Sequence, residues 1–174
     1  MMRSAIIAFD GRCRLELRRI WDPDLPRAAW LMLNPSKADA EVDDPTLLRV
    51  VHFSRKLGAG SAVVVNVLPW RATDPEDMLR ALRCGEITDD MLATNLASVR
   101  AASLESQFHV AAFGVVHASL GWHRSRVLES FSRYADNGLL CLGRSPAGWP
   151  LHPLARGKFA VRNDVEPGPW VRAA

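Results

Sequence analysis

The chain has 174 residues, of which 48% are hydrophobic and 24% are charged, and its formal net charge is +3. These values are ordinary for a globular protein with one well-buried core, and the mild basicity permits a nucleic-acid partner without requiring one. No apolar run reaches the roughly 18 residues of a membrane span, and the apolar stretch near the N-terminus is too short for a signal peptide. We therefore expect a cytoplasmic protein with no membrane partner, and a monomer.

The three cysteines, Cys13, Cys84 and Cys141, are odd in number and far apart in the chain. Because no CxxC pair is present, the sequence indicates neither a zinc ribbon nor a disulfide framework. Reduced thiols in a cytosolic protein are the simplest interpretation.

The first predicted elements are a β-hairpin and a buried strand. Residues 4–9 and 13–21 flank Asp10 and Gly11, a pair that favours a tight turn. Residues 28–33 then form a short, nearly continuous apolar run, which is typical of a strand that is buried on both faces.

Helices and strands alternate through most of the remaining chain. The predicted helices follow Thr46, run from Asp74 through Leu82, extend from Thr88 through Leu104, and cover residues 119–134. The later predicted strands are residues 62–66, 110–113 and 139–142. This alternation predicts a three-layer α/β/α sandwich around a mostly parallel four-stranded sheet, with the N-terminal hairpin at one edge.

The domain prediction is a single domain over residues 1–174. Within it we distinguish a hairpin extension at residues 1–27, a core at residues 28–158 and a tail at residues 159–174. The end of the tail, residues 167–170, is rich in proline and glycine and is expected to be poorly ordered or loosely docked.

Polar side chains follow three of the apolar runs. Asn34 and Asn66 come at the ends of the first two buried strands, and His152 lies in the loop after the last strand. Because ligands of open α/β sheets bind outside the carboxyl ends of the parallel strands, we expect these side chains to converge on one pocket.

Each of these residues has a functional and a structural interpretation. Pro35 holds Asn34 extended, so that its amide can hold a water, although an Asx-turn would give the same pattern. The amide of Asn66 presents a donor and an acceptor side by side, which matches the edge of a nucleobase, or it caps a strand. His152 can stabilise a developing anion, or it is a surface residue.

An acidic cluster follows Asn34, comprising Asp39, Glu41, Asp43 and Asp44. One of these carboxylates could activate water, or Asp43 and Asp44 could bind a divalent cation. The structural alternative is a solvated acidic loop with a helix N-cap.

Basic and aromatic residues occur in the predicted strand-end loops. The candidate phosphate contacts are Arg71, Arg144, Arg156 and Lys158. Trp70 and Trp149 are candidate platforms for stacking on a base, with rim or core packing as the alternative. His117 and His123 do not have the spacing of a helical metal-ligand pair, so no metal site is predicted.

Together the motifs resemble those of the uracil-DNA glycosylase superfamily. Residues 33–36 match the first-strand motif of that superfamily at Asn34 and Pro35. Asn66 matches an asparagine at the end of the second strand, and the following loop through Arg71 is similar in one branch. Gly114 after the third strand resembles a family glycine, and His152 with Pro153 matches the late His-Pro motif.

The resemblance covers residues 28–158 and implies a fold, a reaction and a site. It implies cleavage of the N-glycosidic bond of a base in a nucleic acid or nucleotide, after the base has been flipped out. Asn34 would hold the water, Asn66 would read the base and His152 would stabilise the leaving base, without a metal or organic cofactor. The other substrate-binding residues would be Pro35, Ser36, Trp70, Arg71, Gly114, Arg144, Trp149 and Pro153.

The alternatives are a binding module without chemistry and a metal-dependent nucleotide hydrolase. The first is favoured by Leu33 and Ser36, which replace glycines of the family motif. The chain is also similar to a family of small bacterial and phage proteins of unknown function, through its Met-Leu-Asn-Pro-Ser, Asp-Asp-Pro-Thr, Val-Asn and His-Pro-Leu segments.

Overall fold

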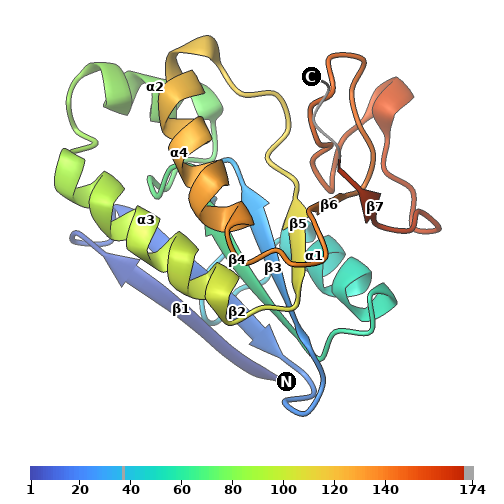
Figure 1. Cartoon of the computed structure of the whole chain (residues 1–174). Coiled ribbons are helices and arrows are strands. Elements are labelled where there is room, and N and C mark those ends of the chain that lie inside the picture. Colours follow the sequence, from blue (N-terminus) through green and yellow to red (C-terminus); the bar gives the residue numbers. More distant parts are fainter. Residues whose placement is uncertain (37, 171–174) are drawn as a thin grey trace.

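The computed structural model describes residues 1–36 and 38–170. In this part of the chain, one mixed sheet of seven strands runs through the molecule in the order β1-β2-β4-β3-β5-β6-β7 (Figure 1). The strands are β1 (Met2–Ala8), β2 (Cys13–Ile20), β3 (Arg27–Met32), β4 (Ser61–Asn66), β5 (Phe108–Ala111), β6 (Leu140–Cys141) and β7 (Gly168–Pro169).

The centre of the sheet is parallel, and its two edges are antiparallel. β4, β3, β5 and β6 run in one direction, whereas β2 pairs antiparallel with β4 and β7 pairs antiparallel with β6. The α/β class predicted from the sequence is confirmed, but the predicted four-stranded, mostly parallel central sheet is not, because the described residues form one mixed sheet of seven strands. The hairpin is part of the sheet, because Leu17 and its neighbours in β2 pair directly with Val64 and its neighbours in β4.

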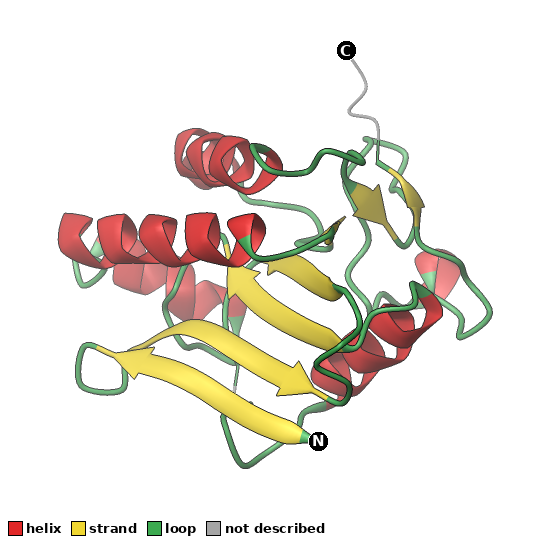
Figure 2. Ribbon diagram, turned by 60° about the horizontal axis from the view of Figure 1, so that its bottom comes forward, coloured by secondary structure: helices red, strands yellow, loops and turns green. Residues whose placement is uncertain are grey.

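Helices cover both faces of this sheet (Figure 2). α1 (Pro45–Lys56) packs on one face, and α2 (Pro75–Arg83), α3 (Asp89–Leu104) and α4 (Gly121–Ser132) lie on the other. Side chains of β4 alternate between the two cores: Val63 and Val65 face α2, α3 and α4, and Ala62 and Val64 face α1. This alternation follows from the two-residue period of a strand, and it places Asn66 on the α1 face.

The helix starts follow the capping signals in the sequence. Asp44 accepts a hydrogen bond from the backbone N–H of Leu47 and caps α1. Asp74 accepts from Glu76 at α2, and Thr88 accepts from Met91 at α3. An N-cap oxygen satisfies backbone donors that have no partner within the helix, which explains why these helices begin where they do.

The C-terminal segment is more firmly docked than the sequence predicts. Gly168 and Pro169 pair with β6, and Trp170 is 8% exposed. The indole N–H of Trp170 donates to the carbonyl oxygen of Gly148 at 3.0 Å, and its ring packs edge-on against Phe113. Burial of this large aromatic ring outweighs the proline and glycine content of the segment.

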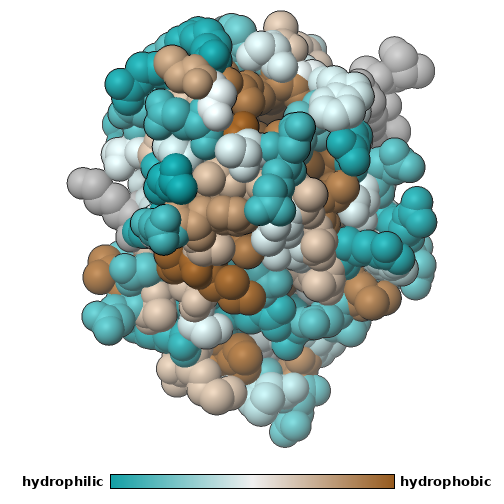
Figure 3. Space-filling model, turned by 90° about the vertical axis from the view of Figure 1, so that its left-hand side faces the viewer, coloured by the Kyte–Doolittle hydropathy of each residue, from teal (hydrophilic) through white to brown (hydrophobic). Residues whose placement is uncertain are grey.

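No helix in the described part of the chain is both long enough and apolar enough to cross a membrane. On the face shown in Figure 3, apolar patches are interrupted by hydrophilic side chains. The most exposed large apolar side chains include Trp122 and Val115, each 69% exposed.

Candidate functional site

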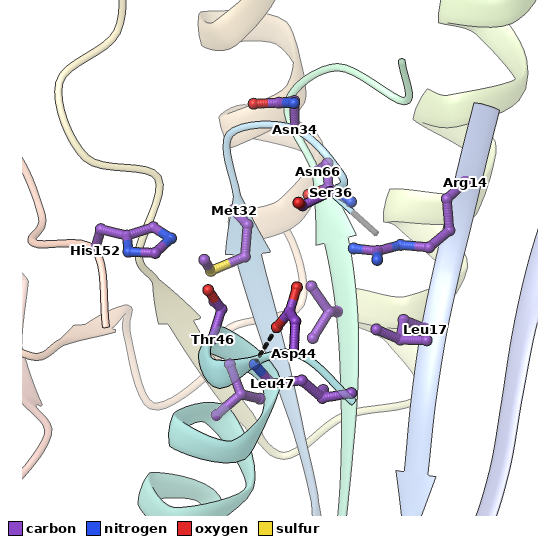
Figure 4. Close-up of a pocket in the computed structure, with 12 residues that line it drawn as sticks. Arg14, Leu17, Met32, Asn34, Ser36, Asp44, Thr46, Leu47, Asn66 and His152 are labelled. Carbon is purple, nitrogen blue, oxygen red and sulfur yellow. Dashed lines mark hydrogen bonds between the residues drawn. The ribbon is translucent and has the colours of Figure 1, made fainter. Parts of the chain in front are cut away.

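A cavity of about 70 Å³ lies at the carboxyl ends of β3 and β4, on the face that α1 covers (Figure 4). It is lined by Arg14, Leu17, Met32, Asn34, Ser36, Asp44, Thr46, Leu47, Val50, Val64, Asn66 and His152. These residues come from β2, β3 and the loop after it, β4, the N-terminal half of α1 with its cap, and the loop after β6. The cavity therefore joins segments that are far apart in the sequence.

The sheet topology explains this location. The crossover through α1 leads from β3 to β4 on one side, and the next crossover returns past β3 to β5 on the other. Because α1 starts from the carboxyl end of β3 on this face, its N-terminus meets the ends of β3 and β4 and the loop after β6 at the carboxyl edge of the sheet, where open α/β sheets bind ligands.

Asn66 is the last residue of β4, and it is completely buried. Neither its side-chain nitrogen nor its side-chain oxygen has a hydrogen-bond partner among the described residues. Its backbone carbonyl oxygen accepts from Nδ2 of Asn95 at 3.0 Å, so the main chain is held while the side-chain amide remains unused. An unsatisfied buried polar group costs about 1–3 kcal/mol, and a bound ligand would recover this cost.

Arg14 reaches the cavity because of a β-bulge in β2. Ile6 of β1 pairs with Glu16, but Ile7 pairs with Arg14, so Leu15 is an extra residue in β2. A one-residue bulge reverses the alternation of side chains along a strand. Arg14 consequently points to the same side of β2 as Leu17, into the cavity (Figure 4).

The guanidinium of Arg14 is only 4% exposed and has few partners. Nη1 donates to the carbonyl oxygen of Ala38 at 2.8 Å, whereas Nε has no partner in the described part of the chain. Burial lowers the pKa of Arg14 to about 10, and the negative charge of Asp44 opposes this effect. Arg14 therefore remains a cation near pH 7, and it is poorly solvated.

Asp44 has two functions in this geometry. Its Oδ1 caps α1 through the backbone N–H of Leu47 at 2.8 Å, and the carboxylate also lines the cavity. Asp44 is therefore the N-cap of α1, two residues before the predicted helix start at Thr46, and this role does not remove the carboxylate from the site.

His152 enters the cavity from the side opposite Arg14 (Figure 4). Its Nδ1 accepts a hydrogen bond from the backbone N–H of Leu154 at 3.0 Å, so the neutral ring carries its hydrogen on Nε2. Burial lowers the pKa of His152, and Asp44 partly opposes the shift. A neutral imidazole with a free N–H donor is therefore the form expected near pH 7.

The loop that carries His152 is fixed by its neighbours. The backbone N–H of Gly114 donates to Pro150 at 3.0 Å, and Nε of Arg49 in α1 donates to Pro153 at 3.3 Å. Gly114 has a φ of +71°, which favours glycine, and a Cβ there would lie 3.9 Å from the Cβ of His152. Gly114 and Pro153 thus hold the loop, and neither lines the cavity.

Asn34 lines the cavity, although its amide is partly committed. Nδ2 donates to the carbonyl oxygens of Ala72 at 2.9 Å and of Pro35 at 3.1 Å. These bonds tie the loop after β3 to the loop after β4. Because these two bonds use Nδ2 as a donor, Oδ1 of Asn34 is the atom of the amide that can accept a hydrogen bond from a ligand.

Trp70 and Arg71 do not line the cavity, but they lie in a groove beside it. The groove is about 280 Å³ and is also lined by Gly11, Arg12 and Ser36. Ser36 is common to the groove and the cavity, so the two spaces adjoin.

Trp149 and Arg144 lie outside the cavity, and Trp149 is not free to stack on a ligand there. The Trp149 ring packs edge-on against Phe113, and the guanidinium of Arg124 lies 4.6 Å above it. Arg144 forms an isolated β-bridge with Pro150. Arg156 and Lys158 lie at the short helix η2 (Gly157–Phe159), also outside the cavity. For Trp149, core packing takes precedence over ligand contact.

The acidic cluster is divided by the fold. Oδ1 of Asp43 accepts from Arg19, and the Asp39 carboxylate accepts backbone hydrogen bonds from Glu41 and Val42, which lower its pKa. No group of three or more potential metal-ligating side chains occurs in the part of the chain that the structure describes. Asp43 is thus paired with Arg19, whereas Asp44 lines the cavity.

Sequence reasoning missed Arg14 and Thr46 as site residues. Thr46 follows the Asp44-Pro45 cap signal directly, and that signal could have placed it beside the site. The bulge that turns Arg14 inward leaves no comparable signal, because it depends on pairing with β1.

A family model described as "Protein of unknown function (DUF1643)" matches residues 14–154. Neither a curated protein nor a solved structure matches the chain. Every cavity-lining residue, from Arg14 to His152, lies within the matched span.

Proposed function

Because the chain belongs to the DUF1643 family, whose function is unknown, we propose from its cavity that it hydrolyses the N-glycosidic bond of a nucleobase. The observation that carries this proposal is Asn66, whose buried amide faces a cavity with both polar atoms unused. The resemblance of Asn34, Asn66 and His152 to glycosylase motifs supports the same reaction.

The lining of the cavity suits a base. The adjacent donor and acceptor of an amide complement the hydrogen-bonding edge of a base. Met32, Leu47, Val50 and Val64 provide apolar contacts for a flat ring. A cavity of about 70 Å³ suits a base better than a whole nucleotide, so the sugar would remain at its mouth.

In the proposed reaction, water attacks C1′ of the sugar, an O–C1′ bond forms and the C1′–N bond breaks. The bonding electron pair leaves with the base. Oδ1 of Asn34 accepts a hydrogen bond from the water, and the carboxylate of Asp44 accepts its proton and stabilises positive charge on the sugar. His152 donates its Nε2–H to the departing base, which finally takes up a proton.

The groove lined by Trp70 and Arg71 extends this proposal to the rest of the substrate. A planar indole beside a cation suits a stacked base and a phosphate of a nucleic acid. The cavity would then hold a flipped base, while the groove would hold the neighbouring nucleotide.

A product assay tests the proposal. The protein is incubated with single- and double-stranded oligonucleotides that contain uracil, hypoxanthine, deaminated guanine or bulky modified pyrimidines, and released base is measured by mass spectrometry. We expect release by the wild type and loss of release in Asn66→Leu and Asn34→Ala. Glu76→Gln, an exposed change on α2, is the matched control.

Binding without release would favour a different function. Because Nδ2 of Asn34 is committed to backbone carbonyls, a module that recognises a base without chemistry is the second candidate. Tight oligonucleotide binding that Asn66→Leu abolishes, with no product from the wild type, would replace the hydrolase proposal with this one.

A further inference from the structure

Arg14 takes no part in the roles assigned to Asn34, Asp44 and His152, yet it is costly to bury. An ionised group removed from water loses several kcal/mol of solvation unless it is paired and hydrogen-bonded. Arg14 makes one hydrogen bond, from Nη1 to Ala38, and has no ion pair within 4 Å among the described residues.

A neighbour on the same strand shows that the fold can compensate such a charge. Arg19 is completely buried, and its Nε and Nη2 donate to Asp43 at 2.8 Å and 2.6 Å. Nη1 and Nη2 also donate to the carbonyl oxygens of Arg18 and Asp39. The unused Nε of Arg14 is therefore a property of its position at the cavity, not a general property of β2.

The geometry places Arg14 where negative charge would develop. Arg14 and His152 enter from opposite sides, with Asn66 between them at the end of β4 (Figure 4). A base held by the amide of Asn66 would present its edges to both donors. When an N-glycosidic bond breaks, the negative charge of the departing base spreads over its ring nitrogens and carbonyl oxygens.

We propose that Arg14 is a catalytic residue that stabilises the anion of the departing base, and that the substrate base therefore bears a carbonyl oxygen. This inference rests on the proposed hydrolysis, because cleavage of the C1′–N bond creates the anion. Arg14 donates an N–H to the carbonyl oxygen and keeps its proton throughout. A cation in a poorly solvated cavity interacts with such an anion more strongly than a cation in water.

The first test is kinetic and uses Arg14→Gln, which keeps a donor but removes the charge. On the substrate that the product assay identifies, we expect kcat to fall by about 10²–10³-fold. The fall in kcat caused by Arg14→Gln should be smaller on a substrate whose base carries a fluorine, because this electron-withdrawing group itself stabilises the anion of the base. A loss that is equal for both bases, or no loss, would overturn the assignment.

The second test does not depend on turnover. 5-Nitrouracil ionises near neutral pH with a change in absorbance, and its binding can be followed across that range. We expect the wild type to prefer the anion at least tenfold over the neutral form and Arg14→Gln to lose this preference. Arg14→Lys, which restores a charge, should recover part of it.

The control is Arg83→Gln, which removes an exposed charge at the C-terminal end of α2, outside both the cavity and the groove. It should keep the preference for the anion. Equal binding of anion and neutral base by wild type and Arg14→Gln, both folded by circular dichroism, would overturn the role of Arg14. Anion binding through Arg14 without base release from any oligonucleotide would refute the hydrolysis and leave Arg14 as a base-anion site.

Discussion

Arg19 and Arg14 lie on one face of β2, and both are buried, but their surroundings differ. Arg19 donates two hydrogen bonds to Asp43 and two to backbone carbonyls, and its hydrogen-bonding capacity is largely used. Among the described residues, the Arg14 guanidinium has one backbone partner and no partner for Nε, and it lines the same cavity as the unpartnered amide of Asn66. The first region is complete without a ligand, and the second is not.

This difference distinguishes a charged side chain that is buried to hold the fold together from one that is buried beside a ligand site. A satisfied buried charge stabilises a particular arrangement of the chain, although it adds little net stability. Unsatisfied buried groups lower the stability of the free protein, and natural proteins keep such groups mainly where a ligand uses them. Four predictions test this comparison.

The largest effect is expected from breaking the Arg19 region. Arg19→Met leaves the carboxylate of Asp43 next to an apolar side chain, and we expect unfolding to become easier by about 3–5 kcal/mol. Arg14→Met removes a poorly solvated charge together with one hydrogen bond, so it should leave the protein as stable or more stable. Urea denaturation measures both. An equal loss of unfolding free energy in the two variants would show that both arginines stabilise the fold to the same extent.

Two buried asparagines give the next comparison. Nδ2 of Asn95 donates to the backbone oxygens of Asn66 and Val67, so Asn95→Leu should cost about 1–3 kcal/mol. Asn66→Leu removes an unsatisfied amide and should leave the protein as stable or more stable. Thermal unfolding of both variants tests this, and a large loss in Asn66→Leu would mean that its amide has a structural partner.

A third prediction concerns pH. Burial lowers the pKa of His109, His123 and His152 below the ordinary 6.5. The unfolded chain then binds more protons than the folded protein just below pH 6.5, so stability should be complete above this pH and decline as pH falls. His152→Gln should make the decline shallower. An unchanged slope in urea titrations would contradict the burial of His152.

The smallest effect on stability is expected at Asp44. Asparagine is about as good an N-cap as aspartate, so Asp44→Asn should change the free energy of unfolding by only a few tenths of a kcal/mol. If the proposed hydrolysis is correct, base release should nevertheless be lost, because the proton acceptor is gone. Calorimetry with the product assay would separate capping from chemistry. Base release at the wild-type rate in Asp44→Asn would show that the Asp44 carboxylate is not the proton acceptor.

The parts of the site that sequence reasoning located are those set by local patterns. An apolar run followed by Asn34 or Asn66 marks a strand end, and parallel strands bring such ends to one edge. His152 is brought there by its loop in the same way. The helices beginning after Asp74 and Thr88 were predictable from their caps, for the same local reason.

The remaining features depend on contacts between distant segments. The sheet has seven strands because β2 pairs with β4, which adds the hairpin, and because β7 pairs with β6; a hairpin pattern does not reveal its neighbour. For Trp149 the sequence left stacking on a base and core or rim packing open; the ring packs against Phe113, since a large ring is buried wherever the tertiary structure provides a surface. Arg14 could not be assigned without the register of β1 against β2.

The bulge at Leu15 makes the electrostatic character of the cavity a matter of strand length as well as of residue identity. Inserting one residue between Ile6 and Ile7 of β1 would give Leu15 a partner and restore regular pairing, and each residue of β2 before Leu15 would exchange faces. Arg14 would then turn toward the α3 side, and Leu15 would take its place. A single codon insertion in β1 would thus exchange a guanidinium for an aliphatic side chain while every residue that lines the cavity remains in the sequence.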